Sequence, residues 1–206
     1  MTDTVYLVGG GPSAEPVLLM EIANQRRHQI IAINDAVFWL PWTVAVFSAD
    51  ARWMADRRDL LLRYRGHTIL AVPDGHPRDI APASASRSIT YLRAVQDRPW
   101  SQDAGVVALN GTSGFAALNY AALTGARRVV LIGYDYGLGP NGRRHWYDES
   151  LGTVRVSGGD VDRWEHWAEH FQKAVPYLSA AGIEVVNTSA DSRVTAFPCR
   201  RLEELL

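Results

Sequence analysis

Residues 109–137 read LNGTSGFAALNYAALTGARRVVLIGYDYG, and this stretch predicts a strand–helix–strand unit. A strand end runs into the small residues of NGTSG at 110–114, and a helix of small side chains follows and ends at Gly125. The run at 129–133 is apolar at every position, which is typical of a strand buried on both faces of a parallel sheet. Asp135 follows at the point where this buried strand reaches the surface.

The same alternation of apolar runs and helical patterns extends along the whole chain. Further strands are predicted at 5–10, 29–34, 42–50, 67–73, 106–110 and 183–189, and further helices at 13–25, 52–66 and 162–182. Strands that alternate with helices predict an α/β fold with a doubly wound, mostly parallel, Rossmann-like sheet of about six to seven strands. We expect a single domain over 1–206, with excursions at about 73–104 and 137–160.

The amino-acid composition indicates which binding partners and which cellular compartment to expect. The chain has 206 residues, a formal net charge of -1 and 47% hydrophobic residues, the balance of an ordinary globular domain. Near-neutral charge argues against a nucleic-acid or anionic-membrane binder. Cys199 is the single cysteine, so the fold needs no oxidising compartment. With no signal-like or membrane-length apolar run, we expect a cytoplasmic protein with no membrane partner, and we leave its oligomeric state open.

Polar and small residues follow the predicted strands at the sheet edge where such folds bind ligands. In an open α/β sheet, ligands lie outside the carboxyl ends of the strands. The residues at those ends, taken in chain order, are Gly9, Gly10, Gly11, Pro12, Ser13, Asn34, Asp35, Ser48, Asp50, Asn110, Gly111, Thr112, Ser113, Gly114, Tyr134, Asp135 and Tyr136. Their convergence from several strands predicts a polar binding site there.

Two helix starts in this set suit an anion. A helix start presents free backbone N–H groups and a partial positive charge, and glycine lets a ligand approach the backbone closely. Residues 9–13 and 111–114 therefore predict a site for phosphate or carboxylate, although Thr112 or Ser113 would also serve as a simple helix cap. Residues 9–14 also fit the G-x-G-x-x-A dinucleotide pattern, with Asp35 near the position of its ribose-binding acid, so an NAD-binding protein is one alternative.

The order of these motifs resembles a known family. VYLVGGGPS at 5–13, IIAIND at 30–35, the stretch at 109–137 and the following His145–Trp146 are similar to the MptE-like, 6-hydroxymethylpterin diphosphokinase-like family of phage and bacterial proteins. The same pattern resembles the small bacterial sialyltransferases that use CMP-sialic acid. Both resemblances imply a Rossmann-like, nucleotide-using transferase.

The resemblance also implies roles for residues. Gly11, Ser13 and Asn34 would contact the nucleotide; Thr112, Ser113 and Gly114 would hold its phosphate or the donor carboxylate; Asp135 and Tyr136 would bind ribose, base or a cation. The sialyltransferases use a histidine from the interval that contains His145 as general base, which gives His145 as one catalytic candidate. Asp135, the acid at the mouth of the switch-point crevice, is the other. For pyrophosphoryl transfer, Mg²⁺ would bridge the phosphates, with Asp50 and Asp135 as its candidate ligands.

The sequence therefore predicts a transferase that moves a pyrophosphoryl or glycosyl (sialyl-type) group from a nucleotide donor, either ATP or GTP or a CMP-sugar, to a small-molecule or glycan acceptor. An inactive nucleotide-binding accessory protein of phage type is the main alternative, because function lies in the site rather than in the fold. HWAEH at 166–170 fits a short zinc-protease pattern, but a packing face of the helix at 162–182 accounts for it as well.

Overall fold

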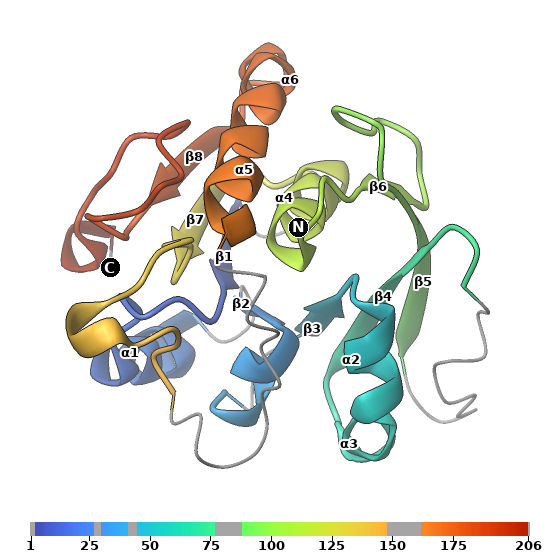
Figure 1. The fold of residues 1–206 in the computed structure, drawn as a ribbon, viewed down its shortest axis with the longest axis horizontal. Coiled ribbons are helices and arrows are strands. Elements are labelled where there is room, and N and C mark those ends of the chain that lie inside the picture. The colour runs from blue at the N-terminus through green and yellow to red at the C-terminus, as the bar shows by residue number, and fades with distance from the viewer. Residues whose placement is uncertain (1–2, 27–29, 41–44, 77–87, 148–161, 206) are drawn as a thin grey trace.

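The computed structural model describes residues 3–26, 30–40, 45–76, 88–147 and 162–205 (Figure 1). They build one eight-stranded sheet with the strand order β6-β5-β4-β3-β2-β1-β7-β8, in which each neighbouring pair is parallel. The strands are β1 Thr4–Val8, β2 Ile30–Ile33, β3 Ala45–Ser48, β4 His67–Pro73, β5 Ile89–Val95, β6 Val106–Ala108, β7 Arg128–Ile132 and β8 Glu184–Asn187. The predicted α/β, doubly wound sheet is confirmed.

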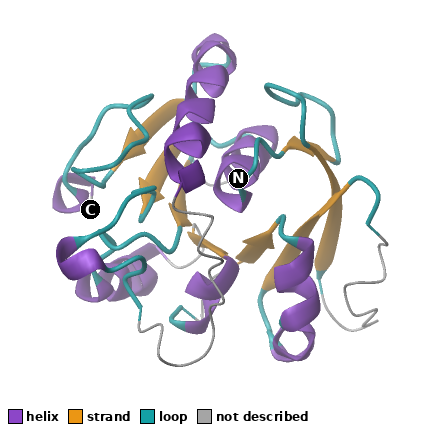
Figure 2. Cartoon of the chain, in the orientation of Figure 1, coloured by secondary structure: helices purple, strands orange, loops and turns teal. Residues whose placement is uncertain are grey.

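Helices cover both faces of the sheet. The α-helices are α1 Pro16–Arg26, α2 Ala51–Asp56, α3 Arg58–Arg63, α4 Ser113–Leu123, α5 Trp164–Glu169 and α6 Val175–Ala180. The 3₁₀ segments are η2 Asn34–Phe38, η4 Pro140–Gly142, η7 His170–Ala174 and η8 Leu202–Leu205. Helices α4, α5 and α6 lie on one side of the sheet, and α1, α2 and α3 lie on the other (Figures 1 and 2).

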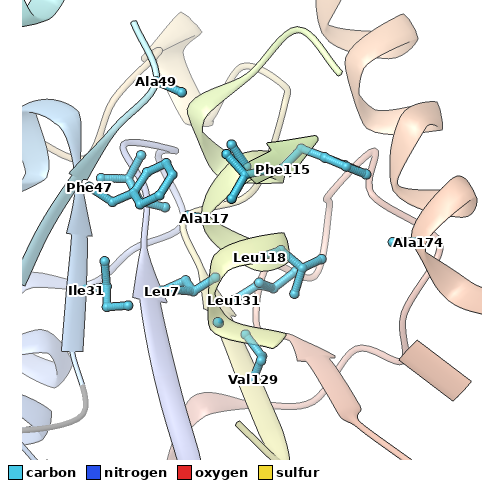
Figure 3. Close-up of a cluster of buried hydrophobic side chains, with 14 of the residues drawn as sticks. Leu7, Ile31, Phe47, Ala49, Phe115, Ala117, Leu118, Val129, Leu131 and Ala174 are labelled. Atoms are coloured by element: carbon cyan, nitrogen blue, oxygen red, sulfur yellow. The ribbon is translucent and has the colours of Figure 1, made fainter. Parts of the chain in front are cut away.

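Successive residues of each central strand belong to opposite cores. Leu7, Ile31 and Phe47 belong to one hydrophobic cluster with Phe115 and Leu118 of α4 (Figure 3). Tyr6, Val8, Ala32 and Val46 belong to the other cluster, which includes residues of α1 and α2. Burial on both faces explains why these strands read as continuous apolar runs. No helix within the described residues is long and apolar enough to cross a bilayer.

The sheet departs from the predicted one at β5. The predicted excursion at 73–104 contains this strand, which lies between β4 and β6. Only alternate residues such as Leu92 and Ala94 are buried, so the segment has no continuous apolar run. The rest of that excursion includes 77–87, which lie outside the described residues, as do residues 148–160 of the excursion at 137–160.

Both long predicted helices are interrupted. The helix predicted at 52–66 is divided at Arg57, between α2 and α3. The one predicted at 162–182 passes through η7 before α6 begins, with a proline in the first turn of α6. Pro176 has no backbone N–H with which to continue an α-helical ladder, and this accounts for the change of helix type.

The strand order sets the position of α4. The chain moves outward from β1 to β6 and then returns, through α4, to place β7 on the other side of β1. This reversal is the topological switch point, at which open α/β sheets bind their ligands. It brings the start of α4, the loop after β1 and the loop after β7 to one edge of the sheet.

Candidate functional site

A cavity of about 1000 Å³ opens at the carboxyl edge of the sheet. Many of the residues predicted for the site line it: Gly9, Gly10, Gly11, Asn34, Asp35, Asp50, Gly111, Thr112, Ser113, Gly114, Tyr136 and His145. Pro12, Ser13, Asn110 and Asp135 are not among the lining residues within the described part of the chain. The structure thus brings most of the predicted residues together, while their functions stay predictions.

The glycine loop after β1 is fastened directly to the end of β7. The Gly9 N–H donates to the carbonyl of Ile132 at 2.8 Å, and the Gly11 N–H donates to that of Gly133 at 2.9 Å. A Cβ atom on Gly11 would overlap Asp135 Oδ2 and lie 2.5 Å from the Gly133 carbonyl oxygen. Glycine at position 11 is therefore required by this close approach of two backbones.

Asp135 lies behind the glycine loop and holds it. Its side chain accepts a hydrogen bond from the Ser13 N–H at 3.1 Å and from Ser13 Oγ at 2.8 Å. Ser189 Oγ donates to the same carboxylate at 3.3 Å and lies 2.6 Å from Ser13 Oγ. Asp135 is only 7% exposed, and burial raises the pKa of its carboxyl group, although the hydrogen bonds from Ser13 oppose this. The geometry favours a positioning role for Asp135.

Two replacements of Asp135 are expected to separate its hydrogen bonds from its charge. Asp135→Ala leaves the Ser13 N–H unpaired, and we expect the free energy of unfolding to fall by about 2 kcal/mol. Asp135→Asn keeps an acceptor and removes the buried charge, so we expect a loss below about 1 kcal/mol. Denaturant unfolding of both variants measures this difference. Equal losses would show that the hydrogen bonds are not what Asp135 contributes.

The difference in stability between the wild type and Asp135→Asn is expected to depend on pH, with a definite sign. Because the pKa of Asp135 is raised in the folded protein, its stabilising contribution is complete below the ordinary value of 3.8 and declines as the pH rises through the folded value. The asparagine variant has no such titration. We therefore expect the stability of the wild type relative to Asp135→Asn to decrease as the pH rises from 3.8.

The start of α4 faces the cavity. Thr112 caps the helix, its hydroxyl accepting from the Phe115 N–H at 3.1 Å, and this hydroxyl lies 3.0 Å from Tyr136 Oη. Ser113 Oγ accepts from the Ala49 N–H at 3.0 Å and ties the helix start to the end of β3. The first N–H groups of a helix have no partner within the helix, and Ser113 and Gly114, which carry two of them, line the cavity at this helix end.

The two predicted acidic residues that line the cavity, Asp35 and Asp50, already have partners. Asp35 Oδ1 accepts from Trp53 Nε1 at 2.8 Å and from Arg57 Nε at 3.1 Å, and Asp35 is 5% exposed. Asp50 caps α2 and accepts from the N–H groups of Arg52 and Trp53. In the described ranges, no three His, Cys, Asp or Glu side chains are grouped so that they could hold a metal ion. The ribose and Mg²⁺ roles of these carboxylates stay predictions.

Asn110 supports the turn beside the cavity. Its Nδ2 donates to the carbonyl of Arg98 at 3.0 Å, and its Oδ1 accepts from Lys173 Nζ at 3.3 Å. His170 of the HWAEH pattern lies with Nδ1 2.8 Å from the Asn110 carbonyl oxygen. Burial lowers the pKa of His170. These contacts give Asn110 and His170 a structural role, joining η7 to the turn before α4.

His145 reaches the cavity from the loop that follows η4. Its Nδ1 lies 3.1 Å from the Gly10 carbonyl oxygen, and its ring stacks on that of Tyr147 with a centroid separation of 5.0 Å. The next residue, Trp146, donates from its backbone N–H to Gly10 and from Nε1 to the carbonyl of Gly9 at 2.9 Å. The segment 145–147 is therefore fastened to the glycine loop through the carbonyl groups of Gly9 and Gly10.

Several residues of the site were missed by the sequence patterns. Trp164 and Trp167 fit the buried stripe of their helix, yet both also line the cavity. Nothing in the sequence around Arg57 indicates that its side chain would pair with Asp35. Ser189 is the last residue of the strand predicted at 183–189, so it stands at the carboxyl end of a strand, as Ser13 does. Applied to β8, the rule that ligands lie outside the carboxyl ends of the strands would have found it.

The comparisons show which known proteins share this fold. No protein-family model matches the chain, and no curated protein matches its sequence. The structure of the MAf glycosyltransferase from Magnetospirillum magneticum AMB-1 matches with a TM-score of 0.63 and 14% identity over 99% of this chain. The match covers 34% of the MAf chain, so this chain spans about a third of that protein. The likeness shows a shared α/β fold.

A second solved structure aligns less well. The sialyltransferase CstII from Campylobacter jejuni, solved in complex with the substrate analogue CMP-3FNeuAc, matches with a TM-score of 0.49 and 11% identity. The alignment covers 96% of this chain and 86% of that one. Both neighbours are glycosyltransferases, whereas membership of the MptE-like family stays a prediction.

Proposed function

We propose that the protein transfers a glycosyl group from a nucleotide-activated donor to a hydroxyl group of an acceptor. One observation carries this proposal: the glycine loop, the start of α4 and His145 line a single cavity. An anion-binding backbone and a candidate base are thus within one space. The fold shared with the MAf glycosyltransferase supports the same reaction class, by analogy.

The donor phosphate is assigned to the start of α4. Backbone N–H groups at Ser113 and Gly114, together with the positive end of the helix, favour an anion there. Arg144 lines the same cavity and would add a charge-assisted hydrogen bond to the phosphate. The leaving nucleotide would be stabilised by these groups without a metal ion.

Asn34 is the residue best suited to contact the nucleoside. Its backbone has a φ of 52°, and its Oδ1 is buried with no hydrogen-bond partner among the described residues. A buried acceptor left unpaired costs about 1–3 kcal/mol. A donor group of the ligand, such as a ribose hydroxyl or a base amino group, would remove this cost, because Asn34 lines the cavity.

The chemistry needs a base close to the acceptor, and His145 supplies it. Histidine is suited to proton transfer near neutral pH. In the proposed reaction, His145 takes the proton of the acceptor hydroxyl while that oxygen bonds to the anomeric carbon of the donor. The bond from this carbon to the phosphate oxygen breaks, and the nucleotide leaves with the electron pair. The alternative, pyrophosphoryl transfer, needs carboxylates for Mg²⁺, and Asp35, Asp50 and Asp135 are engaged in the contacts described above.

A thermal-shift experiment tests the nucleotide part of the proposal. We expect CMP and CMP-sialic acid to raise the melting temperature without Mg²⁺, by about 5–10 °C at 100 times the dissociation constant. Asn34→Gly keeps a residue that tolerates positive φ and removes the amide acceptor. At the same ligand concentration, we expect this variant to show about half of the wild-type shift, which corresponds to a tenfold weaker affinity.

The same ligands distinguish the alternatives. Stabilisation by ATP or GTP only with Mg²⁺ would favour pyrophosphoryl transfer, and stabilisation by NAD⁺ alone would favour a dinucleotide-binding protein. An absence of any shift would contradict the proposal and favour an accessory protein that has lost its nucleotide. A full wild-type shift in Asn34→Gly would remove Asn34 from the proposed contacts.

A further inference from the structure

We infer that the Gly10 carbonyl and the ring of Tyr147 together hold His145 as the tautomer with its proton on Nδ1. Nε2 is then the basic nitrogen of the neutral ring, and Tyr147 is a positioning residue that acts through His145. The catalytic value of this arrangement rests on the proposed function, but the tautomer itself does not. It is a property of the unliganded protein.

The hydrogen bond to Gly10 decides the tautomer. His145 Nδ1 lies 3.1 Å from the Gly10 carbonyl oxygen, and a carbonyl oxygen can only accept. Nδ1 must therefore carry the proton, and a neutral imidazole has only one N–H group, so the lone pair lies on Nε2. A histidine that acts as a base through Nε2 needs this tautomer.

The position of the Gly10 carbonyl is itself restrained. It also accepts from the Trp146 N–H at 3.2 Å, and the neighbouring Gly9 carbonyl accepts from Trp146 Nε1. The next residue of the loop, Gly11, donates its N–H to the carbonyl of Gly133 at the end of β7. The acceptor that selects the tautomer is thus held from both the 145–147 segment and the end of β7.

Aromatic stacking restrains the plane of the His145 ring. The ring is stacked on Tyr147 with an interplanar angle of 5°, and Tyr147 is stacked in turn on Trp39 at 6.2 Å and 13°. Tyr147 is buried, and Trp39, which is 37% exposed, follows η2. A Cβ atom on Gly10 would lie 2.9 Å from Tyr147 Oη and 3.0 Å from His145 Nδ1, so the stack and the glycine fit together.

Nuclear magnetic resonance of protein labelled with ¹⁵N in its histidines tests the inference. A long-range ¹H–¹⁵N correlation spectrum, recorded where the rings are neutral, shows which ring nitrogen bears the proton. The His145 signals are those lost in His145→Gln. We expect protonated Nδ1 in the wild type and in Tyr147→Phe, which keeps the ring. In Tyr147→Leu we expect a mixture containing the Nε2–H tautomer.

Two further variants serve this test. Tyr177→Leu removes a similar stack, at 6.2 Å and 13°, between Tyr177 and Trp100, neither of which is among the described residues that line the cavity, and should leave His145 unchanged. Trp39→Leu removes the exposed end of the stack and should give a smaller tautomer change than Tyr147→Leu. It stays informative if the buried Tyr147→Leu variant does not fold.

Each result has a distinct meaning. Protonated Nε2 in the wild type would overturn the inference, even if CMP-sialic acid proved to be a donor. Protonated Nδ1 in the wild type, Tyr147→Leu and Trp39→Leu alike would overturn the role of the aromatic stack. Protonated Nδ1 in a protein that binds none of the nucleotides would refute the proposed function and leave the tautomer assignment intact.

Discussion

His145→Gln is expected to lower the rate of glycosyl transfer by about 100- to 10,000-fold, the usual contribution of a general base. The reason is geometric as well as chemical. His145 lines the cavity with the start of α4 and is held against the Gly10 carbonyl. Glutamine has no nitrogen lone pair that can accept a proton near neutral pH, but it keeps a polar side chain of similar reach. The rate with saturating donor and acceptor is the quantity to measure.

A measurement of nucleotide binding distinguishes the loss of a base from a loss of donor binding. Since His145 is assigned to the acceptor proton and not to the donor phosphate, we expect the dissociation constant of CMP to change by less than about threefold. His76→Gln is the matched control, because His76 lines the same cavity and is exposed. A rate within a factor of about ten of the wild type in His145→Gln would exclude His145 as the base.

The sheet edge could be predicted because its signals are local. Each apolar run ends at small or polar residues, and parallel strands bring those residues to one edge. The rule placed Asn34, Ser113 and Gly114 at a cavity that they do line. The rule uses only the position of each residue at the end of a strand, and not its contacts with other side chains.

The direction of a side chain at that edge was harder to predict. Asp135 follows β7 as expected, but the absence of a Cβ at Gly11 allows its carboxylate to turn away from the cavity, toward Ser13 and Ser189. Asp35 is similarly engaged by Arg57, which lies between α2 and α3. Such pairings depend on the three-dimensional distance between segments far apart in the chain, which spacing within one motif does not give.

The β5 strand shows the corresponding limit for the fold. Its apolar residues alternate with exposed ones such as Tyr91 and Arg93, and the Pro- and Ser-rich segment before it reads as a loop. A strand buried on one face only has a weaker signal than its neighbours buried on both. The count of strands was therefore too low, although the class of sheet was correct.

Gly11→Ala is expected to lower the free energy of unfolding by about 3 kcal/mol, from overpacking and the loss of a backbone hydrogen bond. The added methyl group would overlap Asp135 Oδ2 and lie 2.5 Å from the Gly133 carbonyl oxygen. To relieve this, the loop must move away from β7 and break the bond from the Gly11 N–H. At this chain length, the melting temperature should fall by about 6–12 °C.

A control variant and a binding measurement test whether the destabilisation comes from the close contact at Gly11 and whether it reaches the cavity. Gly137→Ala places its methyl group no closer than 3.7 Å to another atom and should change the melting temperature by less than about 2 °C. In Gly11→Ala the glycine loop, which is a predicted contact of the nucleotide, moves away from the start of α4, so CMP should no longer stabilise the folded variant. If Gly11→Ala folds with wild-type stability and still binds CMP, the close contact between the glycine loop and Asp135 is not what forms the site. That result would also contradict the proposed positioning role of Asp135, because this role consists of holding the loop through Ser13.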